Sequence, residues 1–263
     1  MIEIQNLSKS YTRNAFAVEN VSLKCEKGIT ALIGLNGAGK STILKCITSF
    51  LYPDDGKILI SDSNGNFFTS EDNSAAVKKH IGFVPEHNIL PKKITVRELL
   101  NMTLDCFGIS ELEKSMAFEK TVKACFLTDV LDKKIGNLSK GYIQRTLLAN
   151  AIIYEPENLI LDEASSGLDP SQIIQFRNLL KEYSKNHTVL ISTHIMQEVS
   201  ALCDKIYVIR EGKIASYGRE KELIQKTKTK TLEEAFLVLN NIENTPIKES
   251  ALEKMSGNEV NNE

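Results

Sequence analysis

The segment GLNGAGKS at residues 34–41 constrains the fold more than any other part of this chain. It matches the pattern G-x-x-x-x-G-K-[ST], in which glycines allow backbone N–H groups to turn inward around a phosphate. The apolar run GITALIG leads into it and the amphipathic run ILKCITSFLY follows it, which predicts a buried strand, a loop and a helix. The positive end of that helix would point at the same phosphate. The segment therefore predicts a nucleotide-binding βα unit.

Two side chains of this loop have separate expected roles. Lys40 would reach the β- and γ-phosphate oxygens, and the Ser41 hydroxyl would be a ligand of Mg²⁺. The residues assigned to nucleotide binding here are Gly34, Asn36, Gly37, Ala38, Gly39, Lys40, Ser41 and Thr42.

A second chemical segment is LILDEASSGLDP, in which a short apolar strand ends in adjacent carboxylates, Asp162 and Glu163. Asp162 would hold Mg²⁺ through its water shell, as the acidic partner in P-loop NTPases does. Glu163 would orient or deprotonate an attacking water. The alternative is that the pair only caps the following helix.

The segment TVLISTH predicts another buried strand, which ends at His194. A single histidine after a strand is usually structural. Here the strand would end on the same edge of the sheet as the other two segments, where ligands bind in α/β folds. The position therefore favours a functional role for His194.

Strands alternate with helices through most of the chain, which indicates a mostly parallel sheet covered on both faces. The expected fold is α/β, with a P-loop NTPase (RecA-like) core, an N-terminal antiparallel β subdomain and an inserted helical subdomain. The remaining expectations by range are antiparallel strands over 1–30, an exposed turn over 61–74, a helical insertion from 95 to about 141, and a hairpin over 205–218 turning at Glu211-Gly212. One domain would span 1–239, followed by a polar, flexible tail over 240–263.

The composition excludes several classes. A net charge of -2 and a pI of about 6.2 leave no basic field for nucleic acid. No apolar run is long enough to span a bilayer, and the first residues lack the pattern of a signal peptide. The five cysteines are scattered without a CxxC pair, which predicts reduced thiols in a cytosolic protein.

In their order and spacing, GLNGAGKST, NLSKGYIQR, LILDEASSGLDP and STH resemble the ATP-binding subunit of ABC transporters. The resemblance covers residues 2 to about 239. NLSKGYIQR corresponds to the signature motif of that family. Two such subunits pack head to tail, so the resemblance implies that Ser139 and Gly141 serve the nucleotide held by the neighbouring subunit.

Further roles follow from the resemblance. It places Tyr11 against the adenine ring, Asp169 where the two sites join, and His194 against the γ-phosphate. Glu163 matches the catalytic carboxylate, and Glu86 stands where the family usually has a glutamine near Mg²⁺ and the attacking water. Departures from the family pattern are Lys140 and Tyr142 in the signature motif, and Ala164 and Ser165 in place of a Pro-Thr pair.

The resemblance implies two kinds of partner, a second ATP-binding subunit, identical or different, and separate transmembrane permease subunits. The protein would be cytoplasmic and peripheral on the membrane, with the Glu86 loop and the helical insertion docking the permease. TLEEAFLVL at 231–239 is similar to the closing helix of subunits that serve exporters of the antibiotic, polysaccharide or gliding-associated class, or it is a simple amphipathic closing helix. KTKTK at 226–230 would be a solvated linker.

Two other functions remain open at this point. One is a non-transport ABC ATPase acting on ribosomes or DNA. The single P-loop and the short distance between the P-loop and the signature motif argue against it. The other is a regulatory module that binds ATP without hydrolysing it. The presence of Glu163 and His194 argues against this function.

Overall fold

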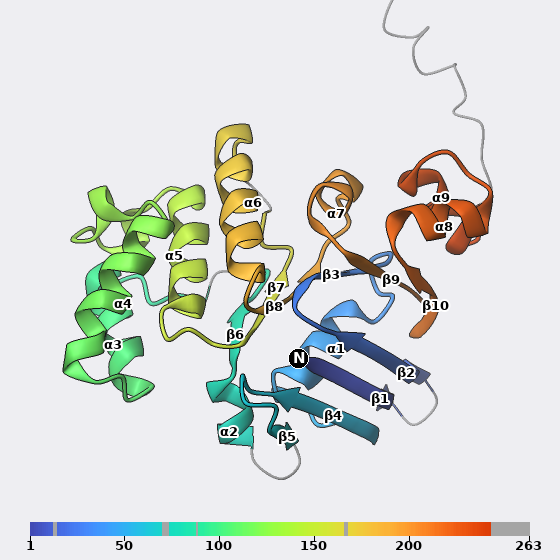
Figure 1. Cartoon of the computed structure of the whole chain (residues 1–263), viewed down its shortest axis with the longest axis horizontal. Coiled ribbons are helices and arrows are strands. Elements are labelled where there is room, and N and C mark those ends of the chain that lie inside the picture. Colours follow the sequence, from blue (N-terminus) through green and yellow to red (C-terminus); the bar gives the residue numbers. More distant parts are fainter. Residues whose placement is uncertain (13–14, 70–73, 88, 166–167, 243–263) are drawn as a thin grey trace, which may run out of the picture.

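A computed structural model describes residues 1–12, 15–69, 74–87, 89–165 and 168–242. It contains two sheets, with strand orders β2-β1-β4-β5 and β10-β9-β3-β8-β7-β6. Figure 1 shows the larger sheet between helices α5, α6 and α7 on one side, and helix α1 with the smaller sheet on the other. The predicted α/β fold with a mostly parallel sheet and an N-terminal antiparallel sheet is confirmed.

The larger sheet forms the core. Its strands are β3 (Gly28–Ile33), β6 (Ile81–Val84), β7 (Asn158–Asp162), β8 (Thr188–Ser192), β9 (Lys205–Arg210) and β10 (Lys213–Gly218). All neighbouring pairs are parallel except β9 and β10. That pair is the predicted hairpin, and both turn residues, Glu211 and Gly212, have positive φ, as a tight two-residue turn requires.

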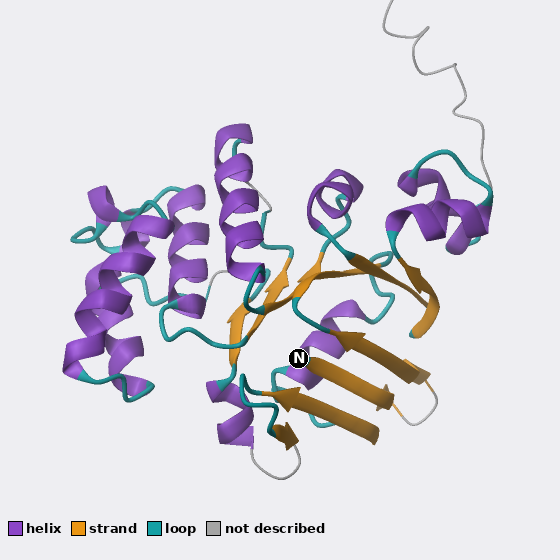
Figure 2. Ribbon diagram, viewed as in Figure 1, coloured by secondary structure: helices purple, strands orange, loops and turns teal. Residues whose placement is uncertain are grey.

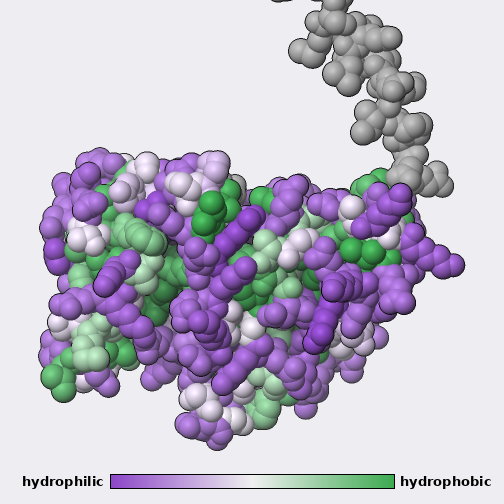
Figure 3. Space-filling view, turned by 45° about the horizontal axis from the view of Figure 1, so that its top comes forward, coloured by the Kyte–Doolittle hydropathy of each residue, from purple (hydrophilic) through white to green (hydrophobic). Residues whose placement is uncertain are grey.

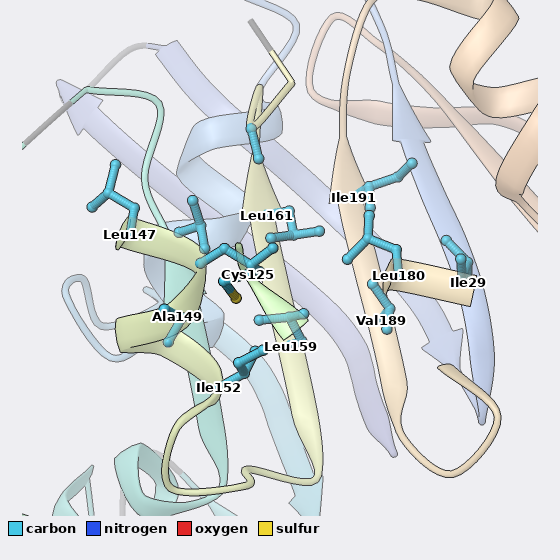
Figure 4. Packing of buried hydrophobic residues seen from close by; sticks show 14 of the residues in the cluster. Ile29, Cys125, Leu147, Ala149, Ile152, Leu159, Leu161, Leu180, Val189 and Ile191 are labelled. Carbon is cyan, nitrogen blue, oxygen red and sulfur yellow. The ribbon is translucent and has the colours of Figure 1, made fainter. Parts of the chain in front are cut away.

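The side chains of the core strands alternate between two hydrophobic clusters. Leu159 and Leu161 of β7 face the helical side, whereas Ile160 faces α1 and the smaller sheet. Figure 4 shows the first cluster, in which Leu180 of α6 lies beside Val189 and Ile191 of β8. Because both faces of these strands are buried, their sequences are continuously apolar rather than alternating.

The smaller sheet contains β1 (Ile2–Thr12), β2 (Ala15–Cys25), β4 (Asp55–Ser61) and β5 (Phe67–Thr69). Its strands are antiparallel and alternate buried and exposed residues where one face is wet. Helix α1 (Lys40–Ile47) packs beneath it, and the glycine loop joins β3 of the larger sheet to this helix.

The helices of the predicted insertion are α3 (Val96–Cys106), α4 (Glu111–Ala124) and the short 3-10 turns η1 (Thr128–Val130) and η2 (Ile135–Asn137), and α5 (Lys140–Ile152) begins where the predicted insertion ends. Thr95 and Glu98 form a capping box at the start of α3, a side-chain arrangement that satisfies free N–H groups. The remaining helices are α2 (Ser74–Lys79), α6 (Pro170–Ser184), α7 (Met196–Leu202), α8 (Glu220–Thr227) and α9 (Leu232–Leu239). Figure 2 distinguishes these helices from the strands by colour.

Two sequence predictions are wrong. The stretch 61–74 is more than a turn, because Phe67–Thr69 pairs with β4 as an edge strand and α2 begins at Ser74. The segment 226–230 is not simply a solvated linker, because Lys226 lies in α8 and its Nζ donates to the Tyr217 carbonyl oxygen at 2.9 Å. Of the predicted tail over 240–263, residues 243–263 lie outside the described residues.

The face drawn in Figure 3 is mainly hydrophilic, with hydrophobic residues in separate groups. Among the helices of the described residues, none combines the length and the apolar character that crossing a bilayer requires. All five cysteines are free thiols, and Cys25, Cys46 and Cys125 are buried.

Candidate functional site

The glycine loop begins where β3 ends at Ile33 and leads directly into α1 at Lys40. Gly39, the residue before α1, has φ 108°, a backbone conformation that L side chains rarely adopt. A Cβ at this position would lie 2.7 Å from the Ala17 carbonyl oxygen of β2. Glycine is therefore required here on two grounds, and the loop can pass close to β2 before the helix starts.

A cleft of ≈ 560 Å³ opens above this loop. Its lining residues are Tyr11, Ala17, Asn36, Gly37, Gly39, Lys40, Ser41, Thr42, Glu86, Asp162, Glu163 and His194. All of these except Ala17 were assigned from the sequence, although the assigned residues come from five separate segments. The assigned residues Gly34 and Ala38 are buried beneath the loop instead.

Lys40 is 7% exposed and lies within the loop itself. Its Nζ donates to the carbonyl oxygens of Gly34 at 2.7 Å and Leu35 at 3.1 Å. Burial lowers the pKa of the Lys40 ammonium, whereas the charges of Glu163, Asp162 and Glu86 act to raise it. The ammonium is thus held by two loop carbonyl oxygens, in a cleft that three carboxylates also line.

Asp162 ends β7 and is 7% exposed. Burial raises the pKa of its carboxyl, the nearby charges of Glu86 and Glu163 raise it further, and the Ser41 hydroxyl acts in the opposite direction. A carboxylate and a hydroxyl are hard oxygen donors of the kind that Mg²⁺ prefers. No three His, Cys, Asp or Glu side chains of the described residues form a metal cage, but Mg²⁺ in nucleotide sites is usually bound by one or two carboxylates with phosphates.

Glu163 and His194 are in direct contact. The distance from His194 Nδ1 to Glu163 Oε2 is 2.8 Å. The His194 side chain is 64% exposed, and the Glu163 side chain is 14% exposed. Asp162 and Ser192 are register partners at the ends of the parallel strands β7 and β8, so the next residues of both strands emerge at one sheet edge. Glu163 has φ 49°, a left-handed conformation, and its N–H donates to the Ser192 carbonyl oxygen at 2.9 Å.

The alternative role of Asp162 and Glu163 as a helix cap is not observed. Asp169 is the N-cap of α6, and its side chain accepts from the Gln172 N–H. The carboxylates at 162 and 163 instead face the cleft.

Tyr11 lies at the rim of the cleft and is 58% exposed. Its hydroxyl is 3.2 Å from Thr42 Oγ1 at the start of α1. The ring is thus available to a flat ligand group beside the loop. Ala17, on the neighbouring strand β2, is the lining residue that the sequence analysis missed, because an alanine carries no chemical signal of its own.

Besides Gly34 and Ala38, three assigned residues lie outside this cleft, namely Ser139, Gly141 and Asp169. Ser139 is exposed and caps α5 by accepting from the Tyr142 N–H at 3.5 Å. Asp169 is exposed at the start of α6. One chain therefore carries a cleft and, apart from it, a pair of capped helix starts.

Comparisons with known proteins agree with this geometry. The family model described as ABC transporter matches residues 18–166. The ABC transporter ATP-binding protein NatA of Bacillus subtilis is 32% identical over 224 residues, covering 84% of this chain and 89% of that protein. The methionine import ATP-binding protein MetN of Clostridioides difficile is 30% identical over 226 residues, covering 85% and 70%.

A solved structure described as the ATP binding subunit of an ABC transporter superposes with a TM-score of 0.84 at 28% identity, covering 91% of this chain and 99% of that one. CbiO1 of Clostridium perfringens, part of the ABC transporter complex cbiONQ, gives 0.74 at 27% identity, covering 90% and 98%. With its P-loop cleft and these relatives, the chain belongs to the ABC transporter family, in which it is an ATP-binding ATPase.

Proposed function

We propose that this chain hydrolyses MgATP in a head-to-tail dimer and couples that reaction to transport through separate membrane permease subunits. The observation that carries the proposal is the contact between Glu163 and His194, 2.8 Å long, in the same cleft as the P-loop residue Lys40. A site that only stored nucleotide would have no use for a base and its orienting group beside the phosphates.

The proposed roles follow the geometry. Glu163 accepts the proton of the attacking water. His194 orients the Glu163 carboxylate and contacts the γ-phosphate. Lys40 neutralises β- and γ-phosphate oxygens from the base of the cleft. Asp162, Ser41 and Glu86 would hold Mg²⁺, which supplies positive charge against the phosphate oxygens. Tyr11 stacks on the adenine ring.

The dimer accounts for the residues that the cleft excludes. Ser139 and Gly141 stand at the start of α5, and Asp169 at the start of α6, outside the cleft of their own chain. In a head-to-tail pair these turns would close over the nucleotide of the partner, so each site takes residues from both chains. We propose a single domain over 1–239 as the unit that dimerises, with the partner either identical or a different ATP-binding subunit.

For the direction of transport, we propose export. The relatives include proteins named for import, so membership of an exporter class is not confirmed. Export rests on the segment 231–239, which consists of α9 and its N-cap Thr231, and this helix packs against α7, α8 and β9. It stays a prediction.

A tagged chain isolated from membranes should carry a polytopic membrane protein with it and should hydrolyse ATP. Lys40→Ala should lose nucleotide binding and hydrolysis but keep the membrane protein, because Lys40 lies at the base of the cleft and is 7% exposed. Lys45→Ala, on the exposed side of the same helix, is the matched control and should keep both. Absence of any membrane protein contradicts the transport role, whereas hydrolysis by Lys40→Ala contradicts the site assignment.

Glu86 should make turnover depend steeply on Mg²⁺. Glu86 lines the cleft and its charge acts on both Lys40 and Asp162, which supports a place for it beside the γ-phosphate. Two like charges at about 4 Å repel by roughly 4 kcal/mol at an effective dielectric near 20, before Mg²⁺ bridges them. Glu86→Gln should therefore lose less activity than the wild type when free Mg²⁺ is lowered. Titrations of hydrolysis against Mg²⁺ that superimpose for the two proteins would show that Glu86 is only a surface loop residue.

A further inference from the structure

The starts of helices α5 and α6 lie side by side, although they belong to the helical insertion and to the core (Figure 1). Asp169 and Gln172 form a reciprocal capping box at the start of α6. The Gln172 N–H donates to Asp169 Oδ1 at 2.9 Å, and the Asp169 N–H donates to Gln172 Oε1 at 3.3 Å. Such a pair satisfies two otherwise free N–H groups and fixes the side-chain amide in place.

The same amide lies against the start of α5. A Cβ built on Gly141 would be 2.4 Å from Gln172 Oε1, 2.8 Å from Nε2 and 2.9 Å from Cδ. A Cβ atom does not approach other atoms this closely, so an alanine at 141 would require the Gln172 amide, the end of a flexible side chain held here by the capping box, to move away. One side chain therefore contacts both turns that lie outside the cleft.

Other residues also link the start of α6 to helix α5. The pKa of the Asp169 carboxyl is lowered by the Gln172 N–H bond and the Ser171 hydroxyl, and also by the charge of Arg145 on α5. The crevice between the helices, lined in part by Arg145, Gln172 and Phe176, encloses only ≈ 20 Å³. Residues of both helices thus line one small crevice, and the Gln172 amide is the group that lies against both turns.

We propose that Gln172 is a positioning residue that sets the Ser139–Gly141 turn against the Asp169 turn, and that position 141 is glycine because the Gln172 amide fills its Cβ space. The inference rests on the proposed function, in which both turns meet the nucleotide of the partner chain. A glycine at 141 has a competing explanation, namely direct approach of its backbone to the partner's phosphates. The two explanations differ in what happens when Gln172 is shortened.

The test measures ATP hydrolysis and ATP binding for the full-length chain. Gln172→Ala should lower kcat about tenfold, the scale expected when a group in the reacting site is displaced slightly. Binding of a fluorescent ATP analogue to the monomer should be unchanged, because Gln172 lies outside the cleft. Gly141→Ala should lower kcat at least as much, since its Cβ must expel the amide or displace α5.

The decisive variant is Gly141→Ala/Gln172→Ala, whose kcat should equal that of Gln172→Ala alone. Its melting temperature should exceed that of Gln172→Ala, because alanine is a better helix former than glycine once space is available. Ser171→Ala is the matched control: Ser171 Oγ also donates to Asp169 Oδ1, at 2.7 Å, but Ser171 is not among the atoms that meet a Cβ at 141. Gly141→Ala/Ser171→Ala should therefore stay as impaired as Gly141→Ala.

Two results would overturn the inference. One is full activity of Gln172→Ala, and the other is a double variant whose losses multiply, which would assign the glycine to the phosphates. Gln172→Asn, with an amide one methylene shorter, repeats the cycle if Gln172→Ala does not fold. A failure of the proposed function is separable, since Ser139→Arg would then hydrolyse ATP like the wild type, whatever the Gln172 variants do.

Discussion

Glu163→Gln is expected to lower ATP turnover by about 10²-fold or more, the usual scale for a lost general base. The glutamine has the same shape as the glutamate, and its carbonyl oxygen can still accept from His194 Nδ1, 2.8 Å away. What it lacks is the capacity to take a proton from water. Binding of ATP should persist, because Lys40 and the glycine loop are unchanged.

Steady-state hydrolysis and binding of a fluorescent ATP analogue together check this prediction. Glu182→Gln, the same substitution on the exposed part of α6, is the matched control and should hydrolyse ATP normally. A wild-type rate for Glu163→Gln would show that the water is activated by another group. Loss of binding would show instead that the substitution had disturbed the loop.

Ser139→Arg should abolish the ATP-dependent dimer. On the Glu163→Gln background, ATP should trap a dimer that light scattering detects at twice the monomer mass. Ser139 is exposed, and its side chain caps α5, so an arginine would remove the cap and fill the space where the partner's phosphates would lie. Loss of such a cap costs about 1 kcal/mol of helix stability, which is too little to unfold the chain.

Ser63→Arg, in the exposed turn that precedes β5, is the control for adding an arginine and should still form the dimer. If Ser139→Arg with Glu163→Gln dimerises as readily as the control, the Ser139 turn does not face the partner. If ATP produces no dimer in any variant, the head-to-tail arrangement itself is wrong.

Most residues that line the cleft could be named from the sequence because they belong to local sequence patterns. A few neighbouring residues are enough to identify the glycine loop between a buried strand and a helix. The same holds for the apolar strands that lead to Asp162 and to His194. Parallel strands bring their carboxyl ends to one edge of the sheet. The residues after these strands could therefore be predicted to share one site even though the strand order was not known. The contact between Glu163 and His194 follows from that topology.

The misses have physical causes as well. Phe67–Thr69 is too short for its alternation to stand out in a polar stretch, and it becomes a strand only by pairing with β4. Ala17 lines the cleft by its place on β2 and not by its chemistry. The positive φ of Glu163 and the contact of Gln172 with Gly141 depend on packing between distant segments, which no local pattern records.

The central claim is that each active site takes its P-loop from one chain and its Ser139 turn from the other. Mixing Lys40→Ala with Ser139→Arg tests it most directly, because each variant alone has no intact site. A mixed dimer combines the P-loop of the Ser139→Arg chain with the Ser139 turn of the Lys40→Ala chain, which rebuilds one of its two sites. An equimolar mixture should therefore hydrolyse ATP at about a quarter of the wild-type rate if chains pair at random, and at about half if only mixed pairs form, provided that the sites act independently. A mixture no more active than the two variants measured separately would contradict the shared site.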